Sequence, residues 1–314
     1  MFNYDKNYIG RKAAELGFIR DTLEKVYRLA DVLEYLNSNP ILKENLALKG
    51  GTAINLTIFN LPRLSVDIDL DYLGADSRDE MIKNREVINL TISRFMLTGG
   101  YSLSPKTKNP HSLDSWVYEY VNMAGNRDNL KIEINYSMRM HIFPVNEMAI
   151  IAEPFESEYK VNCLSAIEIF GSKINALLSR AAARDLYDIY NMIRLGLFNE
   201  KESVLLRKSA VFYAAVSAKE INNNFDTKAI DNISNYKIRT DLYPVITKRD
   251  EFDLTSAKKL VIDYITTLMV LTSQEKEFVG RFENKEYLPA LVFEDEDILK
   301  RIGKHPMALW KMQN

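Results

Sequence analysis

Three aspartates stand at alternate positions in the segment LPRLSVDIDLDY, residues 61–72. Apolar residues separate Asp67, Asp69 and Asp71, which is the pattern of a β-strand with one buried face and one polar face. Side chains two positions apart on a strand lie about 7 Å from each other, close enough for two carboxylates to share one cation. Aspartate is depleted in strands, and neighbouring carboxylates repel. A divalent metal ion would explain the pattern; a solvated strand face is the alternative.

Two glycines and a threonine precede this strand in the segment LKGGTAINL. Gly50 and Gly51 are expected at a strand-to-helix turn, where backbone N–H groups can approach a ligand and a helix N-terminus attracts phosphate. Thr52 is expected to cap the helix. A purely structural turn is the alternative. A phosphate-binding turn beside an acidic strand is the combination that phosphoryl or nucleotidyl transfer requires.

A third carboxylate is available in NLKIEINYS, where Glu133 alternates with apolar residues. On a later strand of the same sheet, Glu133 would lie next to Asp67 and Asp69. It would serve there as a metal ligand or as the base for an incoming hydroxyl. The alternative is an exposed strand face carrying Lys131 and Glu133.

The spacing of apolar residues predicts the elements that must position these side chains. Helices are expected over residues 11–38, 52–60 and 79–98, and strands over 46–48, 63–72 and within 101–108, 115–123 and 129–138. This order predicts a mixed α/β domain that ends near residue 155. Beyond it, Ser165 and Glu168 have capping-box spacing at the start of a helix, a second helix begins near Asp185, and most of the remainder is helical. The acidic cluster FEDEDILKR is expected to be a helix start.

Composition limits the function further. The chain has 314 residues with 46% hydrophobic and 27% charged residues and a net charge of −2, which argues against a protein coated in positive charge. The single cysteine, Cys163, and the absence of a signal-like or membrane-spanning apolar run predict a cytoplasmic enzyme or binding protein without a membrane partner. With three histidines, any metal would be held by carboxylates.

Three blocks, LKGGTAINL, RLSVDIDLDY and EIFGSKINALLSRAAARDLYDIY, together resemble the AbiEii/AbiGii toxin family, the nucleotidyltransferase-like toxins of type IV toxin–antitoxin and abortive infection systems. The blocks span roughly residues 46–195. The resemblance implies an α+β fold: a mixed-sheet nucleotidyltransferase domain similar to that of DNA polymerase β, over residues 1–158, and a helical lobe over 159–314. It also implies that the chain binds NTP with Mg²⁺ (or Mn²⁺), that it acts on the 3′ acceptor end of tRNA, and that a winged-helix antitoxin is its partner.

The resemblance also assigns residues by position. Gly50, Gly51, Thr52 and Ser65 match the positions close to the phosphates, Asp67 and Asp69 the metal ligands, Lys173 the lysine that reaches the triphosphate, and Arg184 and Asp185 the later RD pair with Asp185 as an essential acid. The helical lobe would contribute Lys173 and Asp185 to the cleft. Two alternatives stay open: Lys173 could be a plain surface residue, and Arg184 could form an i,i+4 salt bridge with Asp188.

The sequence therefore predicts a Mg²⁺-dependent nucleotidyltransferase toxin that transfers NMP from NTP to an RNA 3′ end. Asp67 and Asp69 would hold the metal with Glu133 as third ligand, and Glu133 or Asp185 would help deprotonate the acceptor. Asp71 is expected outside the metal's first coordination shell. The alternatives are a non-catalytic nucleotide-binding regulatory protein and an enzyme that transfers NMP to a protein.

Overall fold

The computed structural model describes residues 5–74, 77–155, 158–217 and 224–313. The chain forms two compact units. Unit 1 comprises Met1–Arg139, Val145–Leu164 and Pro244–Arg249; unit 2 comprises Met140–Pro144, Ser165–Tyr243 and Asp250–Asn314. The boundary expected after residue 158 falls inside unit 1, because the next strand, Lys160–Cys163, belongs to the unit 1 sheet.

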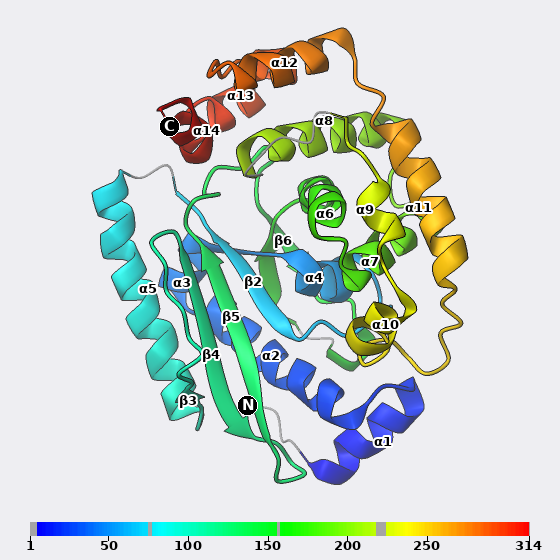
Figure 1. Cartoon of the computed structure of the whole chain (residues 1–314). Coiled ribbons are helices and arrows are strands. Elements are labelled where there is room, and N and C mark those ends of the chain that lie inside the picture. The colour runs from blue at the N-terminus through cyan, green and yellow to red at the C-terminus, as the bar shows by residue number, and fades with distance from the viewer. Residues whose placement is uncertain (1–4, 75–76, 156–157, 218–223, 314) are drawn as a thin grey trace. The chain divides into compact units, whose positions relative to one another are not determined.

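Unit 1 is built on a seven-stranded mixed sheet with the order β3-β4-β5-β2-β1-β7-β6 (Figure 1). The strands are β1 Leu46–Lys49, β2 Asp67–Tyr72, β3 Ser102–Leu103, β4 Leu113–Val121, β5 Arg127–Asn135, β6 Asn146–Ala149 and β7 Lys160–Cys163. β2 runs parallel to β5, and β1 runs parallel to β7, while the remaining pairs are antiparallel. The mixed sheet predicted from the order of elements is present.

The helices of unit 1 are α1 Lys6–Leu16, α2 Arg20–Ser38, α3 Pro40–Asn45, α4 Gly50–Ala53, a π-helical turn Ile54–Ile58, and α5 Arg78–Thr98, with a 3-10 turn at Glu153–Phe155. α2 and α5 cover the apolar face of the sheet (Figure 1). The Arg28 guanidinium of α2 lies 4.3 Å from the ring centroid of Tyr120 in β4, and Arg85 of α5 donates to the buried carboxylate of Asp114 at 2.6 Å. Both contacts lie on the face of the sheet that carries the buried side chains of β4.

Three helical segments differ from the sequence-based expectation. The segment 11–38 is not one helix, because Gly17 adopts φ +80° and ends α1 before α2 begins. The helix expected over residues 52–60 begins at Gly50 and continues from Ala53 into the π-helical turn. The capping box at the start of α5 is formed by Ser77 and Glu80, so that helix begins one residue before the predicted position.

Unit 2 is helical in the part of the chain that the structure describes. Its helices are α6 Ala166–Arg180, α7 Ala183–Arg194, α8 Glu200–Ser217, α9 Lys228–Asp231, α10 Asn235–Lys237, a π-helical turn Ile238–Leu242, α11 Leu254–Leu268, α12 Ser273–Glu283, a 3-10 turn Pro289–Leu291, α13 Glu296–Ile302 and α14 Pro306–Gln313. α6 packs against α7, α8 and α9. α13 starts in the acidic cluster with Asp295 as its N-cap, as predicted.

The start of α6 differs from the predicted capping box in one detail. Ser165 caps the helix by accepting from the Glu168 N–H, but Glu168 does not complete the capping box. Its buried carboxylate instead accepts from the backbone N–H groups of Ile142 and Phe143 and from the Tyr213 hydroxyl. Glu168 therefore fastens the segment Met140–Pro144 to unit 2. Among the described residues, no helix is long and apolar enough to cross a membrane.

Candidate active site

The glycine turn between β1 and α4 is closely covered by side chains from the following segment. Gly50 adopts φ +67°, and a Cβ at this position would lie 2.5 Å from Oδ2 of Asp69. A Cβ on Gly51 would lie 2.5 Å from a terminal guanidinium nitrogen of Arg63 and 2.9 Å from Oγ of Ser65. Glycine is therefore favoured at Gly50 by its backbone conformation, and a Cβ at either position would require the covering side chains to shift.

Thr52 does not cap the helix as expected. The N-cap is Lys49, and Thr52 is the third residue of α4. The Thr52 side chain is fully buried, and its hydroxyl donates a hydrogen bond to the backbone carbonyl of Asp67. This bond fastens the glycine turn to the first residue of β2, so Thr52 positions the acidic strand and can offer a ligand only its backbone.

The strand β2 presents its aspartates on one face, as the alternation predicts. Ile68 and Leu70 are buried, while Asp67 and Asp69 are half-buried on the opposite face. In the described part of the chain the carboxylate of Asp67 makes no hydrogen bond or ion pair. A half-buried carboxylate in that state is suited to accept a cation.

Asp71, the third aspartate of the strand, has a different role. It is buried and forms an ion pair with Lys49 of the neighbouring strand β1. Its charge is therefore compensated within the protein. An aspartate paired in this way is poorly placed to bind a metal ion as well.

Glu133 lies beside the two aspartates in the backbone register. The parallel pairing of β2 with β5 places Asp69 opposite Glu133 and Asp67 opposite Lys131. The Glu133 carboxylate lies 2.9 Å from the Lys131 ammonium. Among the described residues, no group of three or more His, Cys, Asp or Glu side chains is arranged to hold a metal ion. Asp67, Asp69 and Glu133 are neighbours in the sheet, and Glu133 is held by its lysine.

Arg63 is a residue that the sequence reading missed. Its side chain is 2% exposed, its Nη1 donates to the Leu64 carbonyl at 3.0 Å, and its backbone N–H donates to the Asn55 side chain. The guanidinium thus places a positive charge directly against Gly51. In the sequence, Arg63 stands just before the S-x-D-x-D pattern. An arginine at such a position is by itself typical of an ordinary surface residue.

Lys173, Asp185 and Asp188 form a buried charge cluster in unit 2. The Lys173 ammonium lies 3.0 Å from Oδ1 of Asp185 and 2.9 Å from Oδ2 of Asp188, and Arg180 contacts the other oxygen of Asp185 at 2.7 Å. Lys173 is 8% exposed, so the alternative of a plain surface lysine is wrong. Asp188 pairs with Lys173, and the alternative i,i+4 pair with Arg184 is not formed; Arg184 makes no ion pair within the described residues.

The cluster fixes the charge of Asp185. Burial favours the neutral acid, but the charge of Lys173 and the hydrogen bond from Arg180 outweigh it and lower the pKa of Asp185 to about 2. Asp185 is therefore ionised at neutral pH and binds a proton very weakly. Such a group can position Lys173 but is poorly suited to act as a general base.

Comparisons with known proteins add to this geometry. The family described as "Nucleotidyl transferase AbiEii toxin, Type IV TA system" matches residues 31–260, well over half of the chain. The chain belongs to the AbiEii toxin family. It is accordingly a nucleotidyltransferase, and the predicted family and enzyme class are confirmed. Membership of a type IV toxin–antitoxin family implies NTP as a substrate and an antitoxin as a partner.

A solved structure supports the fold of this AbiEii chain. MenT4, a nucleotidyltransferase toxin from Mycobacterium tuberculosis H37Rv, is similar over 98% of this chain and 99% of its own, with 16% sequence identity and a TM-score of 0.66. At that identity the likeness concerns the fold, and it confirms the predicted nucleotidyltransferase architecture. No curated protein matches the chain.

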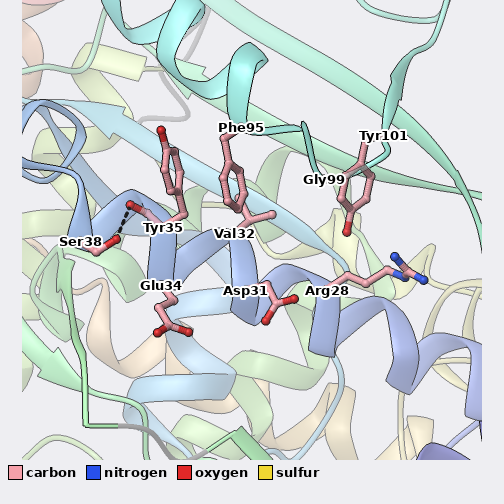
Figure 2. A pocket seen from close by; sticks show the side chains of 9 residues that line it. All are labelled: Arg28, Asp31, Val32, Glu34, Tyr35, Ser38, Phe95, Gly99 and Tyr101. Atoms are coloured by element: carbon pink, nitrogen blue, oxygen red, sulfur yellow. Dashed lines mark hydrogen bonds between the residues drawn. The ribbon is translucent and has the colours of Figure 1, made fainter. Parts of the chain in front are cut away.

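A cavity of about 230 Å³ in this AbiEii chain lies away from the glycine turn. Figure 2 shows its walls, with Tyr35 stacked on Phe95 and with Arg28 and Tyr101 at one end. These residues belong to α2, to α5 and to the turn after α5, on the face of the sheet opposite Asp67 and Asp69. The cavity is therefore separate from the candidate active site.

Proposed function

We propose that this AbiEii toxin transfers NMP from an NTP to the 3′ end of an RNA, with the acceptor end of tRNA as the substrate, and that it requires Mg²⁺. The observation that carries the proposal is the juxtaposition of the glycine turn with Asp67 and Asp69 and, one strand further, Glu133. Without a Cβ at either glycine, the backbone N–H groups of the turn can approach a phosphate once the covering side chains shift, and the adjacent carboxylates are suited to a hard cation.

The donor set fits magnesium. Asp67 and Asp69 offer only oxygen ligands, Asp67 is without a partner among the described residues, and the Asp69 carboxylate overlies Gly50. Asp67 and Asp69 would hold the ion, with Glu133 as an additional ligand once its contact with Lys131 opens. When bound, the ion would neutralise charge on the triphosphate and activate the attacking oxygen.

The protein's own groups would orient the NTP. Backbone N–H groups of Gly50, Gly51 and Thr52, with Ser65, would contact the phosphates, and Arg63 would add positive charge at the same turn. A role of Lys173 and Arg184 in binding the triphosphate rests on the family resemblance alone.

The reaction is a displacement at the α-phosphorus. The acceptor 3′ oxygen forms a bond to this phosphorus, the bond to the bridging oxygen of the β-phosphate breaks, and pyrophosphate leaves. The hydroxyl proton must pass to a base. We assign this role to Glu133, because the pKa of about 2 makes Asp185 a weak base.

The test is an incubation of the protein with Mg²⁺, each α-labelled NTP and total tRNA, with and without EDTA. Asp69→Asn is expected to abolish labelling, whereas the control Asp79→Asn, which removes the same charge from exposed α5, leaves it unchanged. Periodate-treated tRNA, which lacks the 3′ diol, should not be labelled. Label that appears on a protein in a cell extract would indicate NMP-ylation of a protein, and absence of transfer to any acceptor would refute the proposal.

A further inference from the structure

One row of side chains crosses the face of the unit 1 sheet that carries Asp67 and Asp69. The pairing registers place Lys49 of β1 opposite Asp69, Asp69 opposite Glu133, Glu133 opposite Ser115 of β4, and Ser115 opposite Lys108 at the edge. Residues directly opposite one another project from the same face of a sheet. In the adjacent row, Asp67 is followed by Lys131 and then by Val117. On the β5 and β4 side of the two aspartates, this face carries Lys131 and Lys108.

If the proposed function is correct, the triphosphate lies at one end of this row and the acceptor at the other. The triphosphate would be held at the β1 side, where the glycine turn, Ser65 and Arg63 lie. In phosphoryl transfer the attacking oxygen and the leaving oxygen lie roughly in line through the phosphorus. The acceptor must therefore approach from the side opposite to the leaving pyrophosphate, which is the side of β5 and β4. The nucleotides that precede the acceptor's terminal hydroxyl would then extend over these two strands.

The charges on β5 and at the sheet edge suit such an acceptor. Lys131 is 36% exposed, and within the described residues its ion pair is with the partly exposed Glu133, at 2.9 Å. An ion pair between partly exposed side chains is weak, so a phosphate can replace the carboxylate as the partner of the lysine. Lys108 is exposed, and its backbone pairs with Ser115 through hydrogen bonds of 2.9 Å in both directions. The backbone at Lys108 is therefore fixed, while its ammonium is available to solvent.

We propose that the face formed by β5, β4 and the segment at Lys108 binds the single-stranded 3′ end of the RNA acceptor. Lys131 contacts the phosphate nearest the reacting 3′ hydroxyl, and Lys108 contacts a phosphate further along the strand. The inference rests on the proposed function and extends it, because it assigns the acceptor's binding surface. Moving Lys131 to a phosphate also frees Glu133 to receive the hydroxyl proton.

The test uses Lys131→Ala, Lys108→Ala and the conservative Lys131→Arg in the full chain. Lys83→Ala is the matched control, because Lys83 is exposed on α5, which covers the other face of the sheet. Binding of fluorescently labelled tRNA is measured by anisotropy over a range of KCl concentrations, with every variant in the transfer-inactive Asp69→Asn background. Steady-state transfer is measured separately in the active background with tRNA and NTP varied in turn.

Each lysine-to-alanine change is expected to lower the magnitude of the salt slope of log Kd by about 0.7, the value for one phosphate contact on a single strand. The KM for tRNA should rise about tenfold, as expected for one lost hydrogen bond to a charged group, with the KM for NTP unchanged. Lys131→Arg should retain most of the binding, and Lys83→Ala should match the parent protein.

The outcomes separate the two proposals. Transfer to RNA with unchanged salt slopes in both lysine variants would overturn the acceptor face and leave the proposed function intact. A change in kcat and its pH profile in Lys131→Ala, without a change in tRNA binding, would mean that Lys131 only holds Glu133, which also overturns it. Lysine-dependent tRNA binding without any transfer would support the face and refute the proposed function.

Discussion

Replacement of Lys173 by methionine tests the buried charge cluster of unit 2 most directly. Methionine has a similar length and keeps the packing of α6, but it removes the cation that lies 3.0 Å from Asp185 and 2.9 Å from Asp188. Both carboxylates are nearly inaccessible to solvent, at 3% and 1% of their side-chain area. Asp185 keeps its contact with Arg180, whereas Asp188 loses the ion pair with Lys173.

The expected cost is large. Removing one partner of a buried ion pair weakens the compensation of the remaining charge and lowers the free energy of unfolding by about 3–5 kcal/mol. This is a large part of the total stability of a typical protein, about 5–15 kcal/mol. In contrast, the triple variant with Lys173→Met, Asp185→Asn and Asp188→Asn removes all three charges of the cluster. It should regain stability to within about 2 kcal/mol of the parent, because neutral groups are cheaper to bury.

The dependence on pH has a definite sign. In the parent the pKa of Asp185 is lowered to about 2, so its contribution to stability is complete above its ordinary pKa of 3.8 and is lost as the pH falls toward 2. In Lys173→Met, burial is expected to raise the pKa of Asp188 above its unfolded value. The variant should therefore become more stable as the pH falls from 7 to 5, by up to about 1.4 kcal/mol per pH unit for one bound proton, while this cluster gives the parent no such gain.

Urea denaturation followed by far-UV circular dichroism at pH 5, 6 and 7 measures these differences. Lys12→Met is a suitable control, because its surface pair with Glu15 is 30% and 57% exposed and its loss should cost less than about 1 kcal/mol. A loss of less than about 1 kcal/mol in Lys173→Met at pH 7, with the pH dependence of the parent, would refute the reasoning. Loss of activity in Lys173 variants can be assigned to NTP binding only when this cost has been measured.

Three further predictions concern the turn, the acidic strand and acid stability. Gly50→Ala should lower transfer activity sharply and cost more stability than Gly100→Ala. Both glycines have positive φ, but of the two only Gly50 would bring a Cβ close to another atom, 2.5 Å from Oδ2 of Asp69. Thermal unfolding and labelled-NTP transfer compare the two variants, and equal effects would count against this close approach. Asp71→Asn should reduce stability through its pair with Lys49 while the Mg²⁺ concentration at half-maximal activity stays within about twofold, so a large rise in that concentration would place Asp71 in the metal site. The parent should lose about 2 kcal/mol of stability between pH 4 and pH 2 as Asp185 takes up a proton, and a loss that is the same in Asp185→Asn would exclude this source.

Local patterns predicted those parts of the site that a single segment encodes. The alternation of Asp67 and Asp69 with apolar residues predicted that the two carboxylates lie on one face of the strand, because side chains on a strand alternate with a period of two. The paired glycines Gly50 and Gly51 predicted the turn, because few other residues adopt its backbone conformation. The break at Gly17 was missed, since the apolar spacing continues through it and hides a helix end.

The partners of the charged residues could not be predicted in this way. Nothing within the strand 67–72 indicates that Asp71 pairs with Lys49, since this depends on the register of two strands. Lys173 illustrates the same limit: helical spacing left its burial undecided, and only the packing of α7 against α6 brings Asp185 and Asp188 to it.

These partners indicate why so acidic a site is compatible with a stable sheet. Two carboxylates that the proposed mechanism does not use are neutralised by a lysine on an adjacent strand or helix: Asp71 by Lys49 and Asp188 by Lys173. Glu133 differs, because its lysine is on its own strand and both side chains are partly exposed. A pair of this kind contributes little stability and can open easily, whereas a buried pair is costly to open. The acid that must change partner during the proposed reaction is therefore the one whose present partner is easiest to replace.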